Sequence, residues 1–237
     1  MDSIIGMHRP LFVSIDGNVG SGKSTFVEEF RKRVSGNPNY LFVQEPVLEW
    51  ESIKSKEGKS MIELFYANQS KYAFSFQMMA YISRLAILKE ALRSAEKNGV
   101  KYIVSERSVD TDRHVFAKML YDDAKIEHVE YEIYNKWYEC FLEDVHIDRR
   151  VYLKATPQLC YQRVTNRARK GEDIPVSYLE RCHDYHTNWL TDFEENEQIL
   201  TLDGTVNIFD QPETLDTWIE RVAHFLGDDD LNKSIEN

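Results

Sequence analysis

The feature that most constrains this chain is a glycine-rich segment near its N-terminus. Residues 17–24 read Gly-Asn-Val-Gly-Ser-Gly-Lys-Ser, the pattern G-x-x-x-x-G-K-S, and they follow an apolar run at 11–15. Glycines leave room for successive backbone N–H groups to turn toward phosphate oxygens. The next residues, 25–31, are typical of a helix, whose N-terminus favours an anion. In this pattern the lysine reaches the outer phosphates and the serine hydroxyl can ligate magnesium.

The segment therefore predicts a site for a nucleoside triphosphate. The residues expected to hold its phosphates are Gly17, Asn18, Val19, Gly20, Ser21, Gly22, Lys23, Ser24 and Thr25.

Short apolar runs alternate with longer stretches of helical periodicity along the rest of the chain. The predicted strands are Leu11–Asp16, Tyr40–Gln44, Lys101–Ser105, Arg150–Lys154 and Ile199–Leu202, and the clearest helical stretches are Phe74–Ala95 and Tyr131–Glu143. This alternation predicts an α/β fold, a five-stranded parallel sheet with helices on both faces. We expect one domain over residues 1–226 and a polar, flexible tail at 227–237.

Composition narrows the class of protein. The 237 residues are 42% hydrophobic, enough for a substantial core, and the net charge of −11 argues against coating nucleic acid. The three cysteines lack metal-ligand spacing, which indicates reduced thiols. No apolar run approaches the roughly 18 residues that span a bilayer, and the first residues lack a signal-peptide core. We expect a cytoplasmic protein without membrane or nucleic-acid partners.

Chemically suggestive residues follow two predicted strands, where parallel sheets bind their ligands. Glu45 follows the second strand and could accept a proton from an attacking hydroxyl. Glu106 follows the third and could hold magnesium, while its neighbour Arg107 could contact the reacting oxygen or the phosphates. The alternatives are a surface glutamate at a strand end and an exposed salt bridge of little energetic weight.

A cluster of arginines lies late in the chain, at Arg163, Arg167 and Arg169. The first two are four residues apart, on one helical face, so we expect them to converge on one ligand. The planar guanidinium suits phosphate oxygens. Turn residues follow, which would let the segment at about 163–175 close as a lid. The alternative is a solvated basic helix.

Taken together, these motifs resemble those of the deoxyribonucleoside kinase family, which includes deoxycytidine, deoxyguanosine and deoxyadenosine kinases. They stand here as the glycine-rich segment, Glu-Pro-Val at 45–47, Phe-Gln-Met-Met-Ala-Tyr-Ile-Ser-Arg at 76–84, Glu-Arg-Ser-Val-Asp-Thr-Asp-Arg at 106–113 and the arginine segment. The resemblance runs from about Leu11 to Phe225. One departure is Asp16, where many relatives carry Glu.

The resemblance implies a P-loop kinase fold and a reaction. The γ-phosphate of ATP, with Mg²⁺, would pass to the 5′-hydroxyl of a deoxynucleoside in nucleotide salvage. It also implies a homodimer joined through long helices, to which the aromatic-rich segment Tyr131–Phe141 would contribute. Packing of that segment in the chain's own core is the alternative.

The resemblance further implies individual roles. Glu45 would be the general base, Arg107 would lie close to the 5′-hydroxyl, and Ser24 with Glu106 would organise magnesium. The three lid arginines would surround the phosphates. The nucleoside would contact Tyr66 and Glu172 at the sugar 3′-hydroxyl, Gln77 at the base edge, and Trp50, Phe76 and Phe116 as aromatic walls. For the aromatic residues, core packing is the alternative. Phe209 is a candidate for stacking on the donor base.

Two charged residues bear on the choice of base. Arg84 lies seven positions after Gln77, on the same helical face, and Asp112 follows the Glu-Arg-Ser segment. In the family, Arg and Asp at these positions accompany cytosine or purine substrates, whereas thymidine-preferring members carry apolar or small residues. A buried charged pair is costly unless it is bonded. We expect purines, deoxyadenosine ahead of deoxyguanosine, or deoxycytidine, over thymidine.

Two other functions compete with this one. A nucleoside monophosphate kinase of the thymidylate kinase type would share the P-loop and lid, but Glu45 would repel the acceptor's phosphate. A P-loop regulatory module would need a guanine-specifying Asn-Lys-x-Asp motif, and the sequence contains none.

Overall fold

The computed structural model describes residues 9–141, 143, 145–194, 198–228 and 231. Its centre is a five-stranded sheet in the order β2-β3-β1-β4-β5, and every pair of neighbouring strands is parallel. The strands are β1 (Leu11–Asp16), β2 (Tyr40–Val43), β3 (Tyr102–Glu106), β4 (Arg149–Lys154) and β5 (Ile199–Asp203). The predicted α/β fold is confirmed, and each predicted strand lies within one residue of an observed one.

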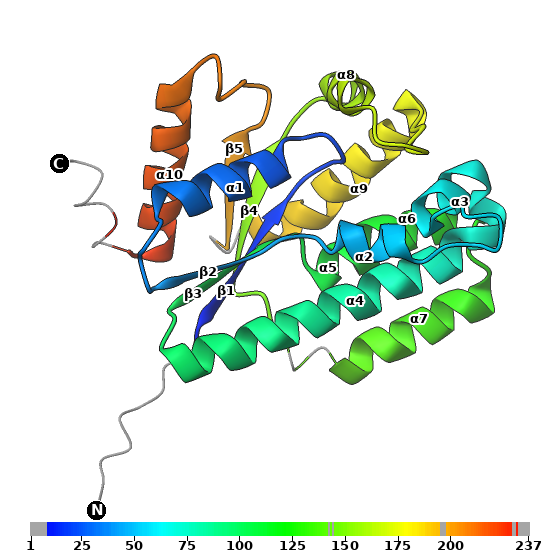
Figure 1. The fold of residues 1–237 in the computed structure, drawn as a ribbon, viewed down its shortest axis with the longest axis horizontal. Helices are drawn as coiled ribbons and strands as arrows, with labels where there is room; N and C mark the ends of the chain where they lie inside the picture. The colour runs from blue at the N-terminus through cyan, green and yellow to red at the C-terminus, as the bar shows by residue number, and fades with distance from the viewer. Residues whose placement is uncertain (1–8, 142, 144, 195–197, 229–230, 232–237) are drawn as a thin grey trace, which may run out of the picture.

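The sheet is buried because helices cover both of its faces (Figure 1). All five residues of β3 are buried, as expected for a central parallel strand. Along β1 the side chains alternate between two apolar clusters. Val13 and Ile15 belong to one, and Phe12 belongs to the other.

One face carries α1 (Lys23–Arg33) and α10 (Pro212–Leu226), which lie side by side in Figure 1. Phe26 and Phe30 of α1 are completely buried against the sheet. Phe26 meets Trp218 of α10 edge to face, with ring centroids 5.6 Å apart. The anchored helix α1 fixes the direction in which the glycine-rich segment before it faces.

The opposite face carries α4 (Gln69–Asn98) and α7 (His128–Phe141). The Asn68 side chain caps the start of α4, and Gly99, with φ 69°, ends it in the left-handed conformation. Both helices cover the stretches predicted from periodicity, except that the α-helix α7 ends before Glu143. They carry buried Tyr81 and Tyr134 toward Phe12 in one core cluster.

Most of the remaining elements lie beyond the carboxyl ends of the strands or beside α4, whereas α9 packs against β4 and β5. They are α2 (Val47–Ser52), α3 (Met61–Ala67), α5 (Val109–Thr111), the π-helix η1 (Asp112–Ala117), α6 (Lys118–Asp122), α8 (Pro157–Arg167) and α9 (Val176–Glu194). Residues of α2, α3, η1 and α8 enclose the space above the glycine-rich segment. Among the described residues, no helix is both long and apolar enough to cross a membrane.

Two described residues of the segment predicted as a flexible tail, Asp228 and Leu231, are packed against the rest of the chain. Asp228 is buried and accepts a hydrogen bond from the Tyr40 hydroxyl at 2.6 Å. Leu231 belongs to the core cluster beside α10. The rest of the predicted tail, 229–230 and 232–237, lies outside the described residues, as do residues 1–8.

Candidate active site

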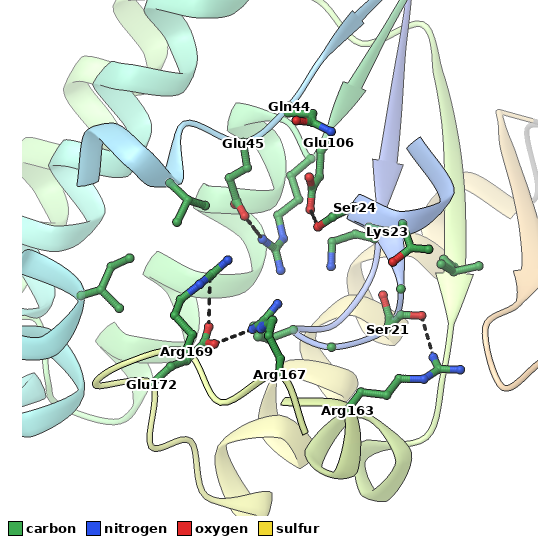
Figure 2. A pocket seen from close by; sticks show the side chains of 18 of the residues that line it. Ser21, Lys23, Ser24, Gln44, Glu45, Glu106, Arg163, Arg167, Arg169 and Glu172 are labelled. Carbon is green, nitrogen blue, oxygen red and sulfur yellow. Dashed lines mark hydrogen bonds and ion pairs between the residues drawn. The ribbon is translucent and has the colours of Figure 1, made fainter. Parts of the chain in front are cut away.

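A single cavity of about 890 Å³ lies at the carboxyl ends of the strands. It is lined by every predicted site residue except Gly17 and Asn18, the first two residues of the phosphate loop. Figure 2 shows the side chains of the phosphate loop, the β2 and β3 ends and the lid facing this space. The structure therefore brings together residues as far apart in the chain as Val19 and Glu172.

The glycine-rich loop adopts backbone conformations that only glycine tolerates well. Gly20 has φ 80°, and a Cβ there would lie 2.5 Å from the Cys160 carbonyl oxygen. Gly22, with φ 103°, is the N-cap of α1, and no side chain caps the helix. The first N–H groups of α1 are therefore available to an anion.

Lys23 lies at the floor of this loop. Its Nζ donates to the Asn18 carbonyl oxygen at 2.6 Å. Burial, together with the positive charge of Arg107, lowers the pKa of Lys23 to about 7. A phosphate would favour the charged form of this lysine. Asn18 itself points away, donating to the Leu179 carbonyl oxygen at 2.8 Å.

Ser24 and Glu106 form an oxygen pair at one side of the loop. The Ser24 hydroxyl donates to a carboxylate oxygen of Glu106 at 2.6 Å. Among the described residues no group of three or more His, Cys, Asp or Glu gathers as a metal site. Magnesium commonly binds through one or two protein oxygens together with substrate phosphates and water. The pair Ser24–Glu106 fits that kind of site.

Glu45 lies between two guanidinium groups. Arg107 Nη1 is 2.7 and 2.9 Å from its two oxygens, and Arg84 Nη2 is 2.7 Å away. Burial alone would raise the pKa of Glu45, but Arg107 and Arg84 lower it to about 2. The side chain is thus a carboxylate at neutral pH and can accept a proton.

Arg107 has an unusual backbone. Its φ of 61° places a side-chain-bearing residue in the left-handed region. Such conformations cluster at functional sites, where the surrounding structure holds them. The guanidinium lies 5.1 Å from the centre of the Phe116 ring. Arg107 thus reaches both the predicted base and one predicted aromatic wall.

Arg84 and Asp112 form a buried ion pair. Arg84 Nε is 2.8 Å from Asp112 Oδ2, and the two side chains are 2% and 3% exposed. Arg84 also donates to the Glu106 carbonyl oxygen at 2.9 Å and to Glu45. The cost of burying these charges is offset by mutual hydrogen bonds. Arg84 consequently links the predicted base-reading pair to the predicted general base.

The far end of the cavity is apolar, with one buried amide. Gln77 is 2% exposed, and its Oε1 has no hydrogen-bond partner among the described residues. Phe76 stacks on Phe65 at 4.5 Å, and Trp50 meets Phe76 edge to face at 5.8 Å. The aromatic residues therefore both pack with one another and line the cavity. Leaving a buried carbonyl oxygen without a hydrogen bond is costly, and the Gln77 Oε1 has the capacity to accept one from a ligand.

The lid arginines have different partners, although all three line the cavity (Figure 2). Arg167 and Arg169 donate to Glu172 at 2.5 and 3.5 Å. Arg163 instead donates to the carbonyl oxygens of Ser21 and Gly204 at 3.0 and 2.7 Å. The expected convergence of Arg163 and Arg167 on one point is not present in this conformation, because backbone carbonyls satisfy Arg163.

Tyr66 lies on the same side of the cavity as Glu172. Burial and the Glu172 charge raise the pKa of the Tyr66 hydroxyl. It thus remains protonated and can donate a hydrogen bond. Its ring meets Tyr178 edge to face at 6.2 Å. Phe209, the candidate for stacking on the donor base, also lines the cavity and is 69% exposed.

Several lining residues escaped the sequence reasoning. They include Leu48, Glu51, Ile62, Gln162, Asn166 and Tyr178. Tyr178 lies in the first turn of α9, the helix after the lid, so the turn at Pro175 was an available signal. The others carry no local signature, because only the tertiary fold turns them toward the cavity.

Comparison with known proteins identifies the family of this chain. The sequence profile described as deoxynucleoside kinase matches residues 13–227. Deoxycytidine kinase 1 of Xenopus laevis is 33% identical over 240 residues, which cover 90% of this chain and 89% of that protein. Human deoxycytidine kinase is 33% identical over 243 residues, covering 90% of each. The mitochondrial deoxyguanosine kinase of Xenopus laevis is 30% identical over 195 residues, covering 76% and 72%.

These matches confirm the predicted enzyme class, an ATP-dependent deoxynucleoside kinase. The site geometry, the fold and the extent of the profile match lead to one conclusion: this chain belongs to the deoxynucleoside kinase family.

Proposed function

We propose that this enzyme transfers the γ-phosphate of ATP to the 5′-hydroxyl of a deoxynucleoside in nucleotide salvage. The observation that carries the proposal is the position of Glu45. This carboxylate lies in one continuous cavity between the phosphate loop and the aromatic end, paired with Arg107. A phosphate donor at one end and a nucleoside at the other would meet beside it.

In this proposal Glu45 accepts the proton of the 5′-hydroxyl as the oxygen attacks phosphorus. Arg107 orients Glu45 and lies near the reacting oxygen. The phosphate-loop amides, Lys23 and the lid arginines bind the phosphate oxygens, since phosphoryl transfer depends on positioning and charge neutralisation. Magnesium, held through Ser24 and Glu106, would supply further neutralisation of the phosphate charge. The short contact between these two oxygens supports that pairing.

The acceptor is proposed to bind at the other end. Tyr66 and Glu172 contact the sugar 3′-hydroxyl, and Gln77 reads the edge of the base. The Gln77 carbonyl oxygen without a protein partner supports the latter role, since a base amine would satisfy it. Stacking on Phe76 and Phe116 adds affinity, on the order of 1–3 kcal/mol per ring, with little discrimination.

The proposed base preference is for purines, deoxyadenosine ahead of deoxyguanosine, or deoxycytidine, over thymidine. The buried pair Arg84–Asp112 supports it, because it leaves polar groups rather than an apolar space for a 5-methyl group. The relatives compared above are named for deoxycytidine and deoxyguanosine. Because two of them are named for deoxycytidine, this nucleoside should be tested beside the purines.

The test is kcat/KM with Mg-ATP for deoxyadenosine, deoxyguanosine, deoxycytidine and thymidine in parallel. We expect one of the first three to exceed thymidine by at least about tenfold. Faster turnover of thymidine than of the other three would reject the base preference. Conversion of a monophosphate to a diphosphate, with no deoxynucleoside phosphorylated, would reject the acceptor and the role of Glu45.

We also propose a homodimer formed through α4 and α7. Four large apolar side chains on these helices are exposed: Ile82 at 53%, Val129 at 60%, Ile133 at 43% and Trp137 at 48%. The Tyr81 hydroxyl donates to the Trp137 carbonyl oxygen, so the two helices meet here. An apolar face of this kind favours a self-complementary contact between copies.

Light scattering of the wild type and of Trp137→Glu tests the dimer. The expected result is a mass near twice 27.9 kDa for the wild type and near 27.9 kDa for the variant. Ile53→Glu, which changes an exposed apolar residue away from this face, serves as the control. A monomeric wild type would remove the proposal.

A reducing, cytoplasmic location is the last part of the proposal. All three cysteines are free thiols, Cys140 exposed and Cys160 and Cys182 buried. Fractionation of the source cells with marker enzymes tests it, and recovery in an oxidising compartment would reject it.

A further inference from the structure

A buried carboxylate lies behind the site and has no part in the roles proposed above. Asp16 is the last residue of β1, directly before the phosphate loop, and it is completely buried. One of its oxygens accepts a hydrogen bond from the Ser14 hydroxyl at 2.6 Å. The other accepts from the Thr111 hydroxyl. A carboxylate is costly to bury, so these partners indicate what it does.

Thr111 connects Asp16 to the loop after β3. Its backbone N–H donates to the Ser108 hydroxyl at 3.3 Å, and the Ser108 N–H donates to the Thr111 hydroxyl oxygen at 3.3 Å. This reciprocal arrangement is a capping box at the start of α5. The hydroxyl that bonds to Asp16 is thus the same one that fixes the loop's exit into the helix.

The loop itself holds a strained residue. Arg107 has φ 61°, a conformation that persists only where the surrounding structure maintains it. Two hydrogen bonds hold its backbone to the strands. Arg107 N donates to the Ile15 carbonyl oxygen of β1 at 3.1 Å, and Ser105 Oγ of β3 donates to the Arg107 carbonyl oxygen at 2.8 Å. After it, the capping box and Asp16 provide the restraint. The loop is therefore held to β1 from both sides.

We propose that Asp16 is a positioning residue. Through Thr111 it holds the loop that presents Glu106, Arg107 and Asp112 to the cavity, and it joins this loop to the strand that leads into the phosphate loop. The inference rests on the roles proposed above for Glu106 and Arg107. Asp16 lies behind the cavity and does not line it.

The test compares three variants with the wild type. Thr111→Val removes the hydroxyl but keeps the shape, Thr111→Ser restores the hydroxyl, and Ser14→Ala removes the other hydrogen bond to Asp16 without changing the loop. For Thr111→Val we expect kcat to fall about 10- to 100-fold, as for a small misplacement of catalytic groups, with less than about a threefold change in KM for ATP. Thr111→Ser and Ser14→Ala should stay within about threefold of the wild type.

A second readout does not depend on turnover. Hydrogen exchange of residues 105–112 should be faster in Thr111→Val than in Ser14→Ala, at equal melting temperature. Thr111→Ala is the substitute if the valine variant unfolds below the assay temperature. Unfolding of both would mean that the contact serves stability alone and would reject the positioning role.

The outcomes separate the two proposals. A wild type that phosphorylates no deoxynucleoside overturns the proposed function, and the exchange measurement still decides the positioning of the loop. An active wild type with an equally active Thr111→Val, or with equal losses in Thr111→Val and Ser14→Ala, overturns the role of Asp16. Rescue by Thr111→Ser together with faster exchange in Thr111→Val supports it.

Discussion

The two ends of the cavity are built in different ways. The phosphate end consists of one contiguous loop, residues 17–25, and the N-terminus of α1. Apart from the lid arginines, the groups proposed to bind phosphate here are backbone N–H donors and one lysine. The nucleoside end draws side chains from α2, α3, α4, η1 and the lid, and it buries several charges. A site made of backbone depends on local conformation, whereas a site made of paired charges depends on how distant elements meet.

The difference affects tolerance to change. At the phosphate end a single added methyl group would clash with the backbone, since a Cβ at Gly20 would lie 2.5 Å from the carbonyl oxygen of Cys160 in α8. At the nucleoside end the charged side chains are linked, because Arg84 donates hydrogen bonds to Asp112, Glu45 and the Glu106 carbonyl oxygen. Substitutions there should alter selectivity and turnover together.

The largest expected effect belongs to Glu45, where the two ends meet. Glu45→Gln should keep nucleoside binding but lower kcat by about 10²- to 10⁴-fold, the usual contribution of a general base. Steady-state kinetics and calorimetric binding measure the two quantities. Glu51→Gln is the matched control, because Glu51 lines the same cavity and forms a long ion pair with Arg169, at 3.9 Å. A kcat near that of the wild type would remove Glu45 from the mechanism.

At the phosphate end, Gly20→Ala should weaken ATP binding on the order of 100-fold, or about 2.7 kcal/mol. The new Cβ would lie 2.5 Å from a backbone oxygen, and φ 80° is unfavourable for alanine. The dissociation constant of ATP measures the change. Gly36→Ala is the control, because Gly36 has a similarly positive φ of 84° but a Cβ added there would meet no atom within 4 Å. Equal ATP affinity in both variants would mean that close packing at Gly20 is not needed.

At the nucleoside end, Arg84→Met combined with Asp112→Ala should raise the ratio of thymidine to deoxycytidine kcat/KM about tenfold. Removing both charges avoids the cost of one unpaired buried ion. Arg93→Met with Glu90→Ala is the control, since this pair is 70% exposed on the same helix. An unchanged ratio would contradict the role of the buried pair in reading the base.

The smallest expected effect concerns His186, behind the nucleoside end. Its ring lies edge to face with Phe116 at 6.1 Å, and Nδ1 donates to the Cys182 carbonyl oxygen at 2.7 Å. Burial lowers the pKa of His186 to about 3. Because the unfolded chain binds a proton below pH 6.5 and the folded one does not, stability is lost as pH falls from 6.5 toward 3.

Urea unfolding at pH 7 and pH 5.5 measures this loss. The wild type should lose about 1 kcal/mol more than His186→Leu over that interval, since one pKa unit corresponds to about 1.36 kcal/mol. Comparison with the variant removes the contribution of carboxylates that titrate in both proteins. Equal losses would show that His186 is protonated in the folded state.

The contrast between the two ends also explains what could be predicted. The five strands and the phosphate loop are encoded in short stretches, where apolar runs and glycine spacing specify the backbone. The expected gathering of the site residues in one cavity followed from the strand ends of a parallel sheet. The hydrogen-bond partners of individual charged side chains could not be predicted from the sequence. Arg163 donates hydrogen bonds to backbone carbonyl oxygens instead of sharing a partner with Arg167. Asp16 accepts a hydrogen bond from Thr111, which is 95 residues away in the chain.

The amino-acid sequence by itself determined where the five strands lie, that they run parallel, and which chemical groups follow the strands that end at the site. It could do so because periodicity and turn chemistry act over a few residues. Only the tertiary structure decided which charges share a partner. The strand order β2-β3-β1-β4-β5 places the ends of β1, β2 and β3 side by side. Within that arrangement burial requires every charge to find a bonded neighbour, and this requirement, rather than any local pattern, joins Glu45, Arg84, Arg107 and Asp112 into one cluster.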